Sequence, residues 1–260
     1  MYLVFFSSCS SWFNFLFGEN MERIDAISRW IRDQVEEAGA QGVVLGLSGG
    51  IDSAVVAAIA QRSLGENVLG VILPCHSHEE DAEDALRIAS HLQLETITID
   101  LTPLYDTLLT VLPPADKHIT ANLKPRLRMT VLYYFAGLRN YLVAGTGNKC
   151  EIAVGYFTKY GDGGVDLLPL GDLLKSQIRE IAYKLALPEA IITKPPSAGL
   201  IPGQTDEGEL KLTYDELEQA LLEITAKTGE KTPGKVRARV EELIQKAGHK
   251  TAPIPVYKDR

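Results

Sequence analysis

Residues 42–60 read GVVLGLSGGIDSAVVAAIA and carry the pattern that decides the fold. The first six residues are apolar and partly β-branched, which predicts a short buried strand. Ser48, Gly49 and Gly50 then turn the chain, and an apolar helix is expected to begin near Asp52. A strand, a glycine turn and a helix in succession are the first part of a parallel β-α-β unit.

The same alternation of strands and helices continues along the chain. Strands are predicted at 42–47, 67–74, 96–101 and 141–146. Helices are predicted at 21–39, 53–65, 77–93, 104–112, 126–140, 173–187, 213–224 and 235–248, the third of them with Ser77 as its N-cap. The segments 113–125, 157–171 and 194–210 are expected to be loops. The sequence therefore predicts an α/β fold, a doubly wound parallel sheet flanked by helices, with further helices at its C-terminal end.

The glycine turn is suited to hold a phosphate. The start of a helix offers unpaired N–H groups and the positive end of its dipole, and glycine lets a phosphate approach the backbone. Ser48 and Ser53 add hydroxyl donors, whereas Asp52 would repel an anion unless a divalent cation lay between them. A Walker A loop needs a lysine after the turn and a dinucleotide fingerprint needs G-x-G-x-x-G, and the stretch has neither. A tight turn without a ligand is the alternative.

The composition excludes several classes of protein. The 260 residues carry a formal net charge of -8, which argues against nonspecific nucleic-acid binding. The cysteines Cys9, Cys75 and Cys150 are far apart and form no C-x-x-C pair, which argues against a zinc ribbon or a disulfide framework. We expect a cytoplasmic protein that binds neither nucleic acid nor membranes.

Residues 1–20, MYLVFFSSCSSWFNFLFGEN, differ in character from the rest of the chain. They are apolar and aromatic, but they lack the basic residues of a signal peptide and are short and serine-rich for a membrane span. We expect them to be an N-terminal extension ahead of a start at Met21, with a membrane-associating segment as the alternative. Residues 21–260 are expected to form a single domain.

Four segments resemble known enzymes. SGGIDS at 48–53 resembles the phosphate loop of the N-type ATP pyrophosphatases, which split ATP into AMP and pyrophosphate. NLKPRLRM at 122–129, the long block GTGNKCEIAVGYFTKYGDGGVDLLPLGDLLKSQ at 145–177 and PPSAGLIPGQTDEGEL at 195–210 resemble the ammonia-dependent NAD synthetases. The resemblance runs from about Met21 to the end of the chain and implies the adenine nucleotide alpha hydrolase-like fold.

This resemblance implies a ligase that forms a C–N bond in the last step of NAD biosynthesis. In that family the carboxylate of deamido-NAD attacks the α-phosphate of ATP and pyrophosphate leaves. Ammonia then attacks the acyl-adenylate and gives NAD and AMP. Members that use glutamine carry an extra amidotransferase domain, for which 260 residues leave no room, so free ammonia is the expected nitrogen donor. The resemblance also implies Mg²⁺ as cofactor, ATP as co-substrate, and a homodimer with the deamido-NAD site at its interface.

The roles of the family's residues transfer to matching positions of this sequence. Asp52 and Lys175 are the implied catalytic residues, and Asp52 and Glu151 are the implied magnesium ligands. The residues implied in ATP binding are Gly46, Leu47, Ser48, Gly49, Gly50, Ile51, Asp52, Ser53, Thr146, Lys175 and Ser197. Those implied in deamido-NAD binding are Arg126, Lys159, Asp166, His249 and Lys250.

Several of these residues have a structural alternative. Arg128 competes with Arg126 as the dinucleotide contact. Lys159 and Asp166 could simply order the glycine-rich loop, and Ser197 could stiffen the proline-rich loop. Two rival functions are a tRNA-thiolating ATP pyrophosphatase and a regulatory module that binds a nucleotide. The first usually has paired cysteines and a basic face, which this sequence lacks. The second would not require Lys175, Glu151 and the long second loop together.

Overall fold

The computed structural model describes residues 8–201, 203–226 and 232–259. Within these ranges four parallel strands form one sheet in the order β3-β2-β1-β4, and all four lie where the sequence predicts them. Their bounds are β1 (Gly42–Gly46), β2 (Val68–Ile72), β3 (Glu95–Thr98) and β4 (Tyr141–Val143). In the register of the sheet, Val43 of β1 is paired with Val68 on one side and Leu142 on the other.

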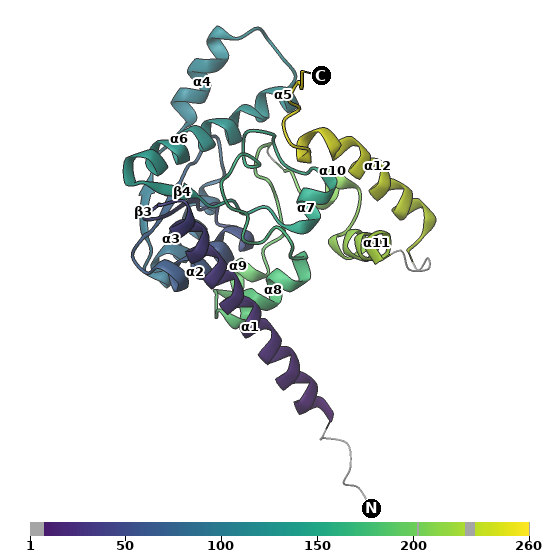
Figure 1. Ribbon diagram of the computed structural model, residues 1–260. Helices are drawn as coiled ribbons and strands as arrows, with labels where there is room; N and C mark the ends of the chain where they lie inside the picture. The colour runs from purple at the N-terminus through teal and green to yellow at the C-terminus, as the bar shows by residue number, and fades with distance from the viewer. Residues whose placement is uncertain (1–7, 202, 227–231, 260) are drawn as a thin grey trace, which may run out of the picture.

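The sheet is covered by helices on both faces because the side chains of its strands alternate (Figure 1). Val43 and Leu45 pack in one cluster with α2 (Ile51–Leu64) and α3 (Glu79–Leu92). Val44, between them, packs in a second cluster with α6 (Leu123–Arg139). The predicted doubly wound sheet is therefore confirmed. The winding reverses between β1 and β4, and in such sheets ligands bind at the carboxyl ends of the strands at this point.

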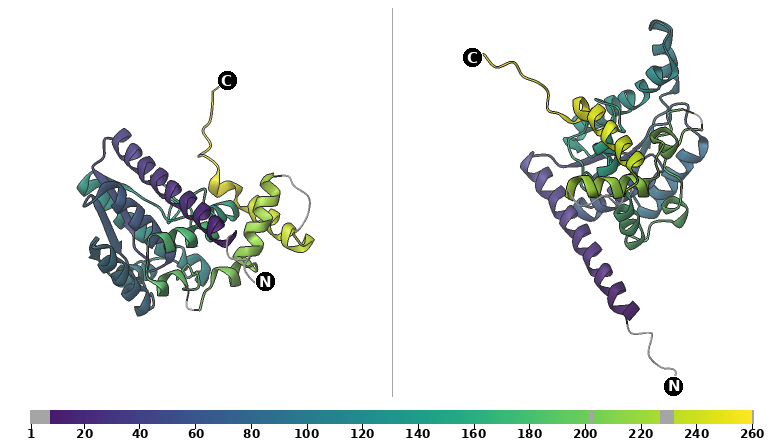
Figure 2. Two further views of the ribbon diagram at one scale, coloured as in Figure 1. Left: turned by 90° about the horizontal axis from the view of Figure 1, so that it is seen from below. Right: turned by 90° about the vertical axis from the view of Figure 1, so that its right-hand side faces the viewer.

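Further helices surround this core, and the C-terminal ones form a layer at its side (Figure 2). Helices α11 and α12 pack against α7 through a third apolar cluster that includes Val154, Leu217 and Val240. The predicted C-terminal helices are thus confirmed. The bounds of the remaining helices are α1 (Ser8–Glu37), α4 (Thr102–Val111), α5 (Lys117–Ala121), α7 (Lys149–Val154), α8 (Lys175–Lys184), α9 (Glu189–Ile192), α10 (Asp206–Leu210), α11 (Tyr214–Ala226) and α12 (Gly234–Thr251).

The N-terminal helix is longer than the sequence pattern indicates. Helix α1 begins at Ser8 and runs without a break through Met21 to Glu37, so the proposed boundary does not coincide with a change of secondary structure. The division into an extension and a domain stays a prediction. In the described part of the chain, no helix combines the length and the apolar character needed to cross a membrane.

The prediction that Ser77 caps α3 is wrong. The N-cap is His78, whose side chain makes no capping hydrogen bond. The Ser77 hydroxyl is bound elsewhere, because it accepts from the backbone N–H of Cys75 at 3.2 Å and from the guanidinium of Arg128 at 3.3 Å.

The short helices α5, α7, α9 and α10 lie where the sequence predicts no helix, and α5 and α10 fall inside the segments 113–125 and 194–210, which are expected to be loops. The side chain of Asp116 accepts from the N–H of His118 at 2.8 Å at the start of α5, and Asn148 forms a capping box with Glu151 at the start of α7. Local capping bonds stabilise such single turns where apolar periodicity does not.

Candidate functional site

The glycine turn lies between the carboxyl end of β1 and the first residue of α2. Gly49 has a φ of 83°, and a Cβ there would lie 2.5 Å from the carbonyl oxygen of Asp81, so both conformation and space require glycine. Gly50 is the N-cap of α2 and has no side chain to offer its first turn. The N–H groups and the positive dipole of α2 are therefore directed at this turn.

Two hydroxyl groups brace the turn from within. The Ser53 hydroxyl is buried, donates to the carbonyl of Gly50 at 2.9 Å and lies 3.1 Å from the hydroxyl of Ser48. Ser48 itself is exposed. The Ser48 hydroxyl also accepts from the backbone N–H of Gly50 at 3.3 Å, so the turn is held in shape before a ligand binds.

Lys175 brings a buried positive charge to the end of this turn. It is the first residue of α8, is 2% exposed, and forms an ion pair with the carboxylate of Asp52. Its ammonium also lies 5.3 Å from the centre of the Tyr214 ring. Burial alone would lower the pKa of Lys175, but the negative charges of Asp52 and Glu151 outweigh it and raise the pKa.

Acidic side chains surround that ammonium. Glu151 accepts from the backbone N–H of Asn148 at 3.1 Å, and removal from water together with the charge of Asp52 raises its pKa to about 8. Asp206 accepts from the Tyr214 hydroxyl at 3.0 Å, and burial raises its pKa also. We call Asp52, Glu151 and Asp206 the carboxylate cluster.

A second group of residues gathers where the loop after α7 meets α6 and α12. The guanidinium of Arg126 donates to the backbone carbonyl of Lys159 at 3.3 Å, and the ammonium of Lys159 donates to the carbonyl of His249 at 2.5 Å. Lys250 donates to the carbonyls of Gly155 and Phe157, each at 2.7 Å. The structure therefore brings four of the five residues predicted to bind deamido-NAD to one place.

Asp166, the fifth of these residues, is held at the end of β4 and has no described hydrogen bond to the other four. Its carboxylate accepts from the Tyr133 hydroxyl at 2.9 Å and from the backbone N–H of Val143 at 2.8 Å. Arg128 differs from Arg126 in direction, because it is turned toward the sheet and donates to the carbonyl of Leu73 at 3.1 Å. The described contacts thus give Arg128 a structural role and leave Arg126 exposed.

The model of the family described as NAD synthase matches residues 23–254. The chain belongs to the NAD synthase family. It is 50% identical over 234 residues to the NH(3)-dependent NAD(+) synthetase of Carboxydothermus hydrogenoformans, which covers 88% of this chain and 94% of that protein.

Two solved structures that are similar to this chain share its fold. The NMN synthetase from Francisella tularensis superposes with a TM-score of 0.86 at 36% identity. The NH3-dependent NAD synthetase from Campylobacter jejuni, solved with a nitrate ion, superposes with a TM-score of 0.81 at 30% identity. Each match covers 92% of this chain and 99% of the other. The nucleotide-binding α/β fold implied by the sequence is thereby confirmed.

The residues present at the turn fit a hard divalent cation. One carboxylate oxygen of Asp52, Oδ1, is buried without a hydrogen-bond partner in the described chain, and an orphaned acceptor of this kind is suited to a metal. Carboxylate oxygens are the ligands that Mg²⁺ prefers, usually one or two from the protein with phosphates and water completing the shell. Among the described residues, no group of three or more His, Cys, Asp or Glu is arranged as a metal site.

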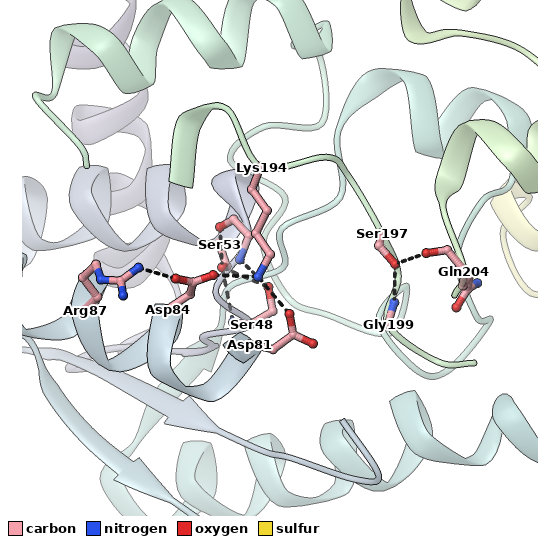
Figure 3. A network of polar contacts seen from close by, with 10 residues as sticks. Ser48, Ser53, Asp81, Asp84, Arg87, Lys194, Ser197, Gly199 and Gln204 are labelled. Carbon is pink, nitrogen blue, oxygen red and sulfur yellow. Dashed lines mark hydrogen bonds and ion pairs between the residues drawn. The ribbon is translucent and has the colours of Figure 1, made fainter. Parts of the chain in front are cut away.

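The two remaining predicted ATP contacts lie in loops. Thr146 follows β4 and is partly exposed. The Ser197 hydroxyl donates to the carbonyl of Gln204 at 2.7 Å and accepts from the N–H of Gly199 at 3.1 Å, so it closes the proline-rich loop on itself (Figure 3). The stiffening role considered for Ser197 is thus present in the structure, and its contact with ATP stays a prediction.

Sequence reasoning missed Asp206, Tyr214 and Lys194. Asp206 and Tyr214 complete the surroundings of Lys175, and Lys194 lies beside the glycine turn. One signal was available for Asp206, because it follows Thr205 at the start of a short acidic segment, as the first residue of a capped helix does. No periodic pattern marks the other two.

Proposed function

We propose that this chain catalyses the ATP-dependent amidation of deamido-NAD by ammonia through an acyl-adenylate, giving NAD, AMP and pyrophosphate. The observation that carries the proposal is the convergence of a charged buried lysine and two carboxylates on a preformed phosphate turn. Membership of the NAD synthase family supplies the substrate class.

The first step joins the dinucleotide to AMP. The amides and hydroxyls of residues 46–53 hold the triphosphate, and the deamido-NAD carboxylate attacks the α-phosphorus. A bond forms between the carboxylate oxygen and that phosphorus, and the bond to the bridging oxygen of the β-phosphate breaks, so pyrophosphate leaves with its electron pair. The ammonium of Lys175 is already charged and fixed, so it stabilises the developing negative charge without rearrangement.

Asp52 and Glu151 are the residues that would hold Mg²⁺. A bound magnesium ion supplies charge neutralisation for the phosphate oxygens and for the departing diphosphate. Asp52 offers its unpaired oxygen, and Glu151 has a capping-box bond to Asn148 that fixes the direction of its carboxyl group.

The second step uses the acyl-adenylate as the electrophile. Ammonia attacks the acyl carbon, the bond to the AMP oxygen breaks, and one proton is released with AMP. Arg126, Lys159 and Lys250 are suited to hold the anionic dinucleotide through both steps, because their charges lie in one connected group at the carboxyl edge of the sheet.

We expect NAD and pyrophosphate to form when the purified protein is mixed with ATP, Mg²⁺, deamido-NAD and ammonium. With glutamine in place of ammonium, NAD formation is expected to be negligible, because no residue of the described chain has a proposed role in hydrolysing the glutamine amide to ammonia. Both products are followed over time, with AMP measured as the third product. Equal rates with glutamine would refute the ammonia-only proposal, and pyrophosphate release without an acyl acceptor would point to a different ATP pyrophosphatase.

The likeness to an NMN synthetase supports nicotinate mononucleotide as a second candidate substrate. It carries the same reacting carboxylate but lacks the adenylyl half of deamido-NAD. The ratio of kcat/KM for the two acids decides between them. We expect the dinucleotide to be preferred, since the group around Arg126 and Lys250 offers contacts beyond the reacting end.

We further propose a homodimer in the cytoplasm, with α6 at the dimer interface. Tyr134 and Leu138 of α6 are each 65% exposed, and Arg126 is exposed on the same helix. Apolar side chains exposed together on one helix are typical of an interface. A partner subunit at this surface would lie next to the proposed deamido-NAD site.

The double substitution Tyr134→Glu and Leu138→Glu is expected to convert a dimer into a monomer, because it would bury unpaired charge at the interface. Sedimentation velocity measures the mass. Leu86→Glu on α3 is the matched control, since Leu86 is 48% exposed on another helix, and its mass should equal that of the wild type. A wild-type monomer, or a dimeric double variant, would reject this interface.

A further inference from the structure

Lys194 places a second ammonium group next to the glycine turn. It follows α9, and its Nζ lies 2.9 Å from a carboxylate oxygen of Asp81 and 2.7 Å from one of Asp84 (Figure 3). The other oxygen of Asp84 lies 2.6 Å from the guanidinium of Arg87. These four residues form a group of two acids and two bases, which we call the α3 clasp.

The clasp lies against the turn itself. A Cβ added to Gly49 would come 2.5 Å from the carbonyl oxygen of Asp81 and 3.0 Å from the Cβ of Asp84. The ammonium that these two residues hold is therefore at the flank of the turn, where Figure 3 shows it beside Ser48.

A positively charged group is needed at the flank of the glycine turn. Asp81 and Asp84 stand close to the place where phosphates are expected, and their charges would repel an anion unless neutralised. The ammonium of Lys175 lies among the carboxylate cluster, and none of its described contacts is with Asp81 or Asp84. Lys194 is the group that neutralises Asp81 and shares Asp84 with Arg87.

The backbone at Lys194 is anchored while its side chain remains accessible. Ile191 and Ile192 are buried just before it, and the ammonium of Lys124 holds the following loop through the carbonyl of Leu200 at 2.8 Å. The Lys194 side chain is 25% exposed, in contrast to the sealed Lys175. A long side chain with a fixed base and an accessible end can change partners without moving the fold.

We propose that Lys194 is a further phosphate-binding residue, which pairs with Asp81 and Asp84 beside the turn in the ligand-free protein and exchanges these acids for the departing diphosphate of ATP. The inference rests on the proposed function and extends it. It would give the turn a second ammonium group besides that of Lys175, supplied by a loop far from the turn in the sequence.

The test measures the binding of inorganic pyrophosphate with Mg²⁺, and separately of AMP, by calorimetry on the full-length protein. Lys194→Gln is expected to weaken pyrophosphate binding by about tenfold or more, the usual effect of losing a hydrogen bond to a charged group. AMP, which lacks the departing phosphates, should bind within about twofold of the wild type. Two control variants accompany this measurement. Lys194→Arg keeps the positive charge and should retain most of the affinity for pyrophosphate.

Lys211→Gln, at an exposed lysine after α10, is the matched control and should change neither the pyrophosphate nor the AMP affinity.

The pyrophosphate affinities of the variants should follow a different pattern if the α3 clasp only stabilises the fold and does not bind phosphate. Asp84→Asn keeps an oxygen acceptor for Lys194 but removes a negative charge near the phosphates, so pyrophosphate should bind at least as tightly as in the wild type. The proposal is wrong if Asp84→Asn weakens pyrophosphate as much as Lys194→Gln does, or if Lys194→Gln binds it normally in a protein that turns over. A wild-type protein that neither binds pyrophosphate nor forms NAD would overturn the proposed function as well.

Discussion

Asp52→Asn is expected to lower turnover by about 100- to 1,000-fold while the fold is kept, a loss typical of removing one group that stabilises transition-state charge. Asparagine has the same shape as aspartate, so the turn and the start of α2 should be unchanged. The substitution removes the charge that faces Lys175 and the unpaired oxygen that suits a cation. The replacement of one oxygen atom thus removes both the ion pair with Lys175 and the proposed cation ligand.

The expected result for Asp52 is checked with the steady-state rate of NAD formation and with a thermal unfolding curve of the same preparation. Asp215→Asn is the matched control, because Asp215 is an exposed acid in the first turn of α11 and loses the same charge away from the site. The control should keep the wild-type rate. A wild-type rate in Asp52→Asn would remove Asp52 from the mechanism, and an unfolded variant would assign it a structural role instead.

The fold was predictable from the sequence where strands are apolar and regular. All four strands were found because each belongs to a short apolar or β-branched run, including the edge strand β3, whose Thr and Ile residues alternate even though they are not fully buried. The start of α1 and the short helices α5, α7, α9 and α10 were not found. A one-turn helix has no room for a 3.6-residue period, and its stability comes from capping bonds that short sequences do not reveal.

The candidate site was predictable where the topology determines it. Gly46 ends β1 and Thr146 follows β4, and these strands are neighbours, so the glycine turn and Glu151 had to meet at the same edge. Lys194 and Asp206 could not be placed in the same way. Their positions depend on the path of the proline-rich loop between α9 and α10, and that path is set by individual hydrogen bonds such as Lys124 to Leu200 rather than by a repeating pattern.

Glu151→Gln is expected to lower turnover strongly and yet to stabilise the ligand-free protein at alkaline pH. The loss of turnover should again be about 100-fold or more, because one of the two proposed cation ligands disappears. The gain in stability follows from the pKa of about 8 that burial and the neighbouring Asp52 impose on Glu151. An amide in the same place is neutral at every pH and avoids the cost of placing a charge there.

The direction of the pH effect follows from comparing the two states. The ordinary pKa of this carboxyl is 4.5 and its pKa in the folded protein is about 8. Below 4.5 both states hold the proton and the contribution of Glu151 to stability is fully present. As the pH rises toward 8, the unfolded chain releases the proton while the folded one retains it, so this contribution is progressively lost. The wild type should therefore lose stability between pH 5 and pH 8, and Glu151→Gln should lack that part of the slope.

Thermal unfolding of both proteins at pH 5 and pH 8, without nucleotide or metal, measures this difference. The melting temperatures should be similar at pH 5, and at pH 8 the variant should melt higher by about 2 to 4 °C for each kcal/mol recovered. Glu241→Gln, at an exposed acid that pairs with Arg237, is the control and should follow the wild type. Addition of Mg²⁺ and ATP should reverse the order, because a ligand that binds only the folded wild type raises its stability in proportion to its affinity. A variant that melts with the wild type at pH 8 would show that Glu151 carries no unfavourable charge in the empty site, and the argument for a cation between it and Asp52 would lose its electrostatic basis.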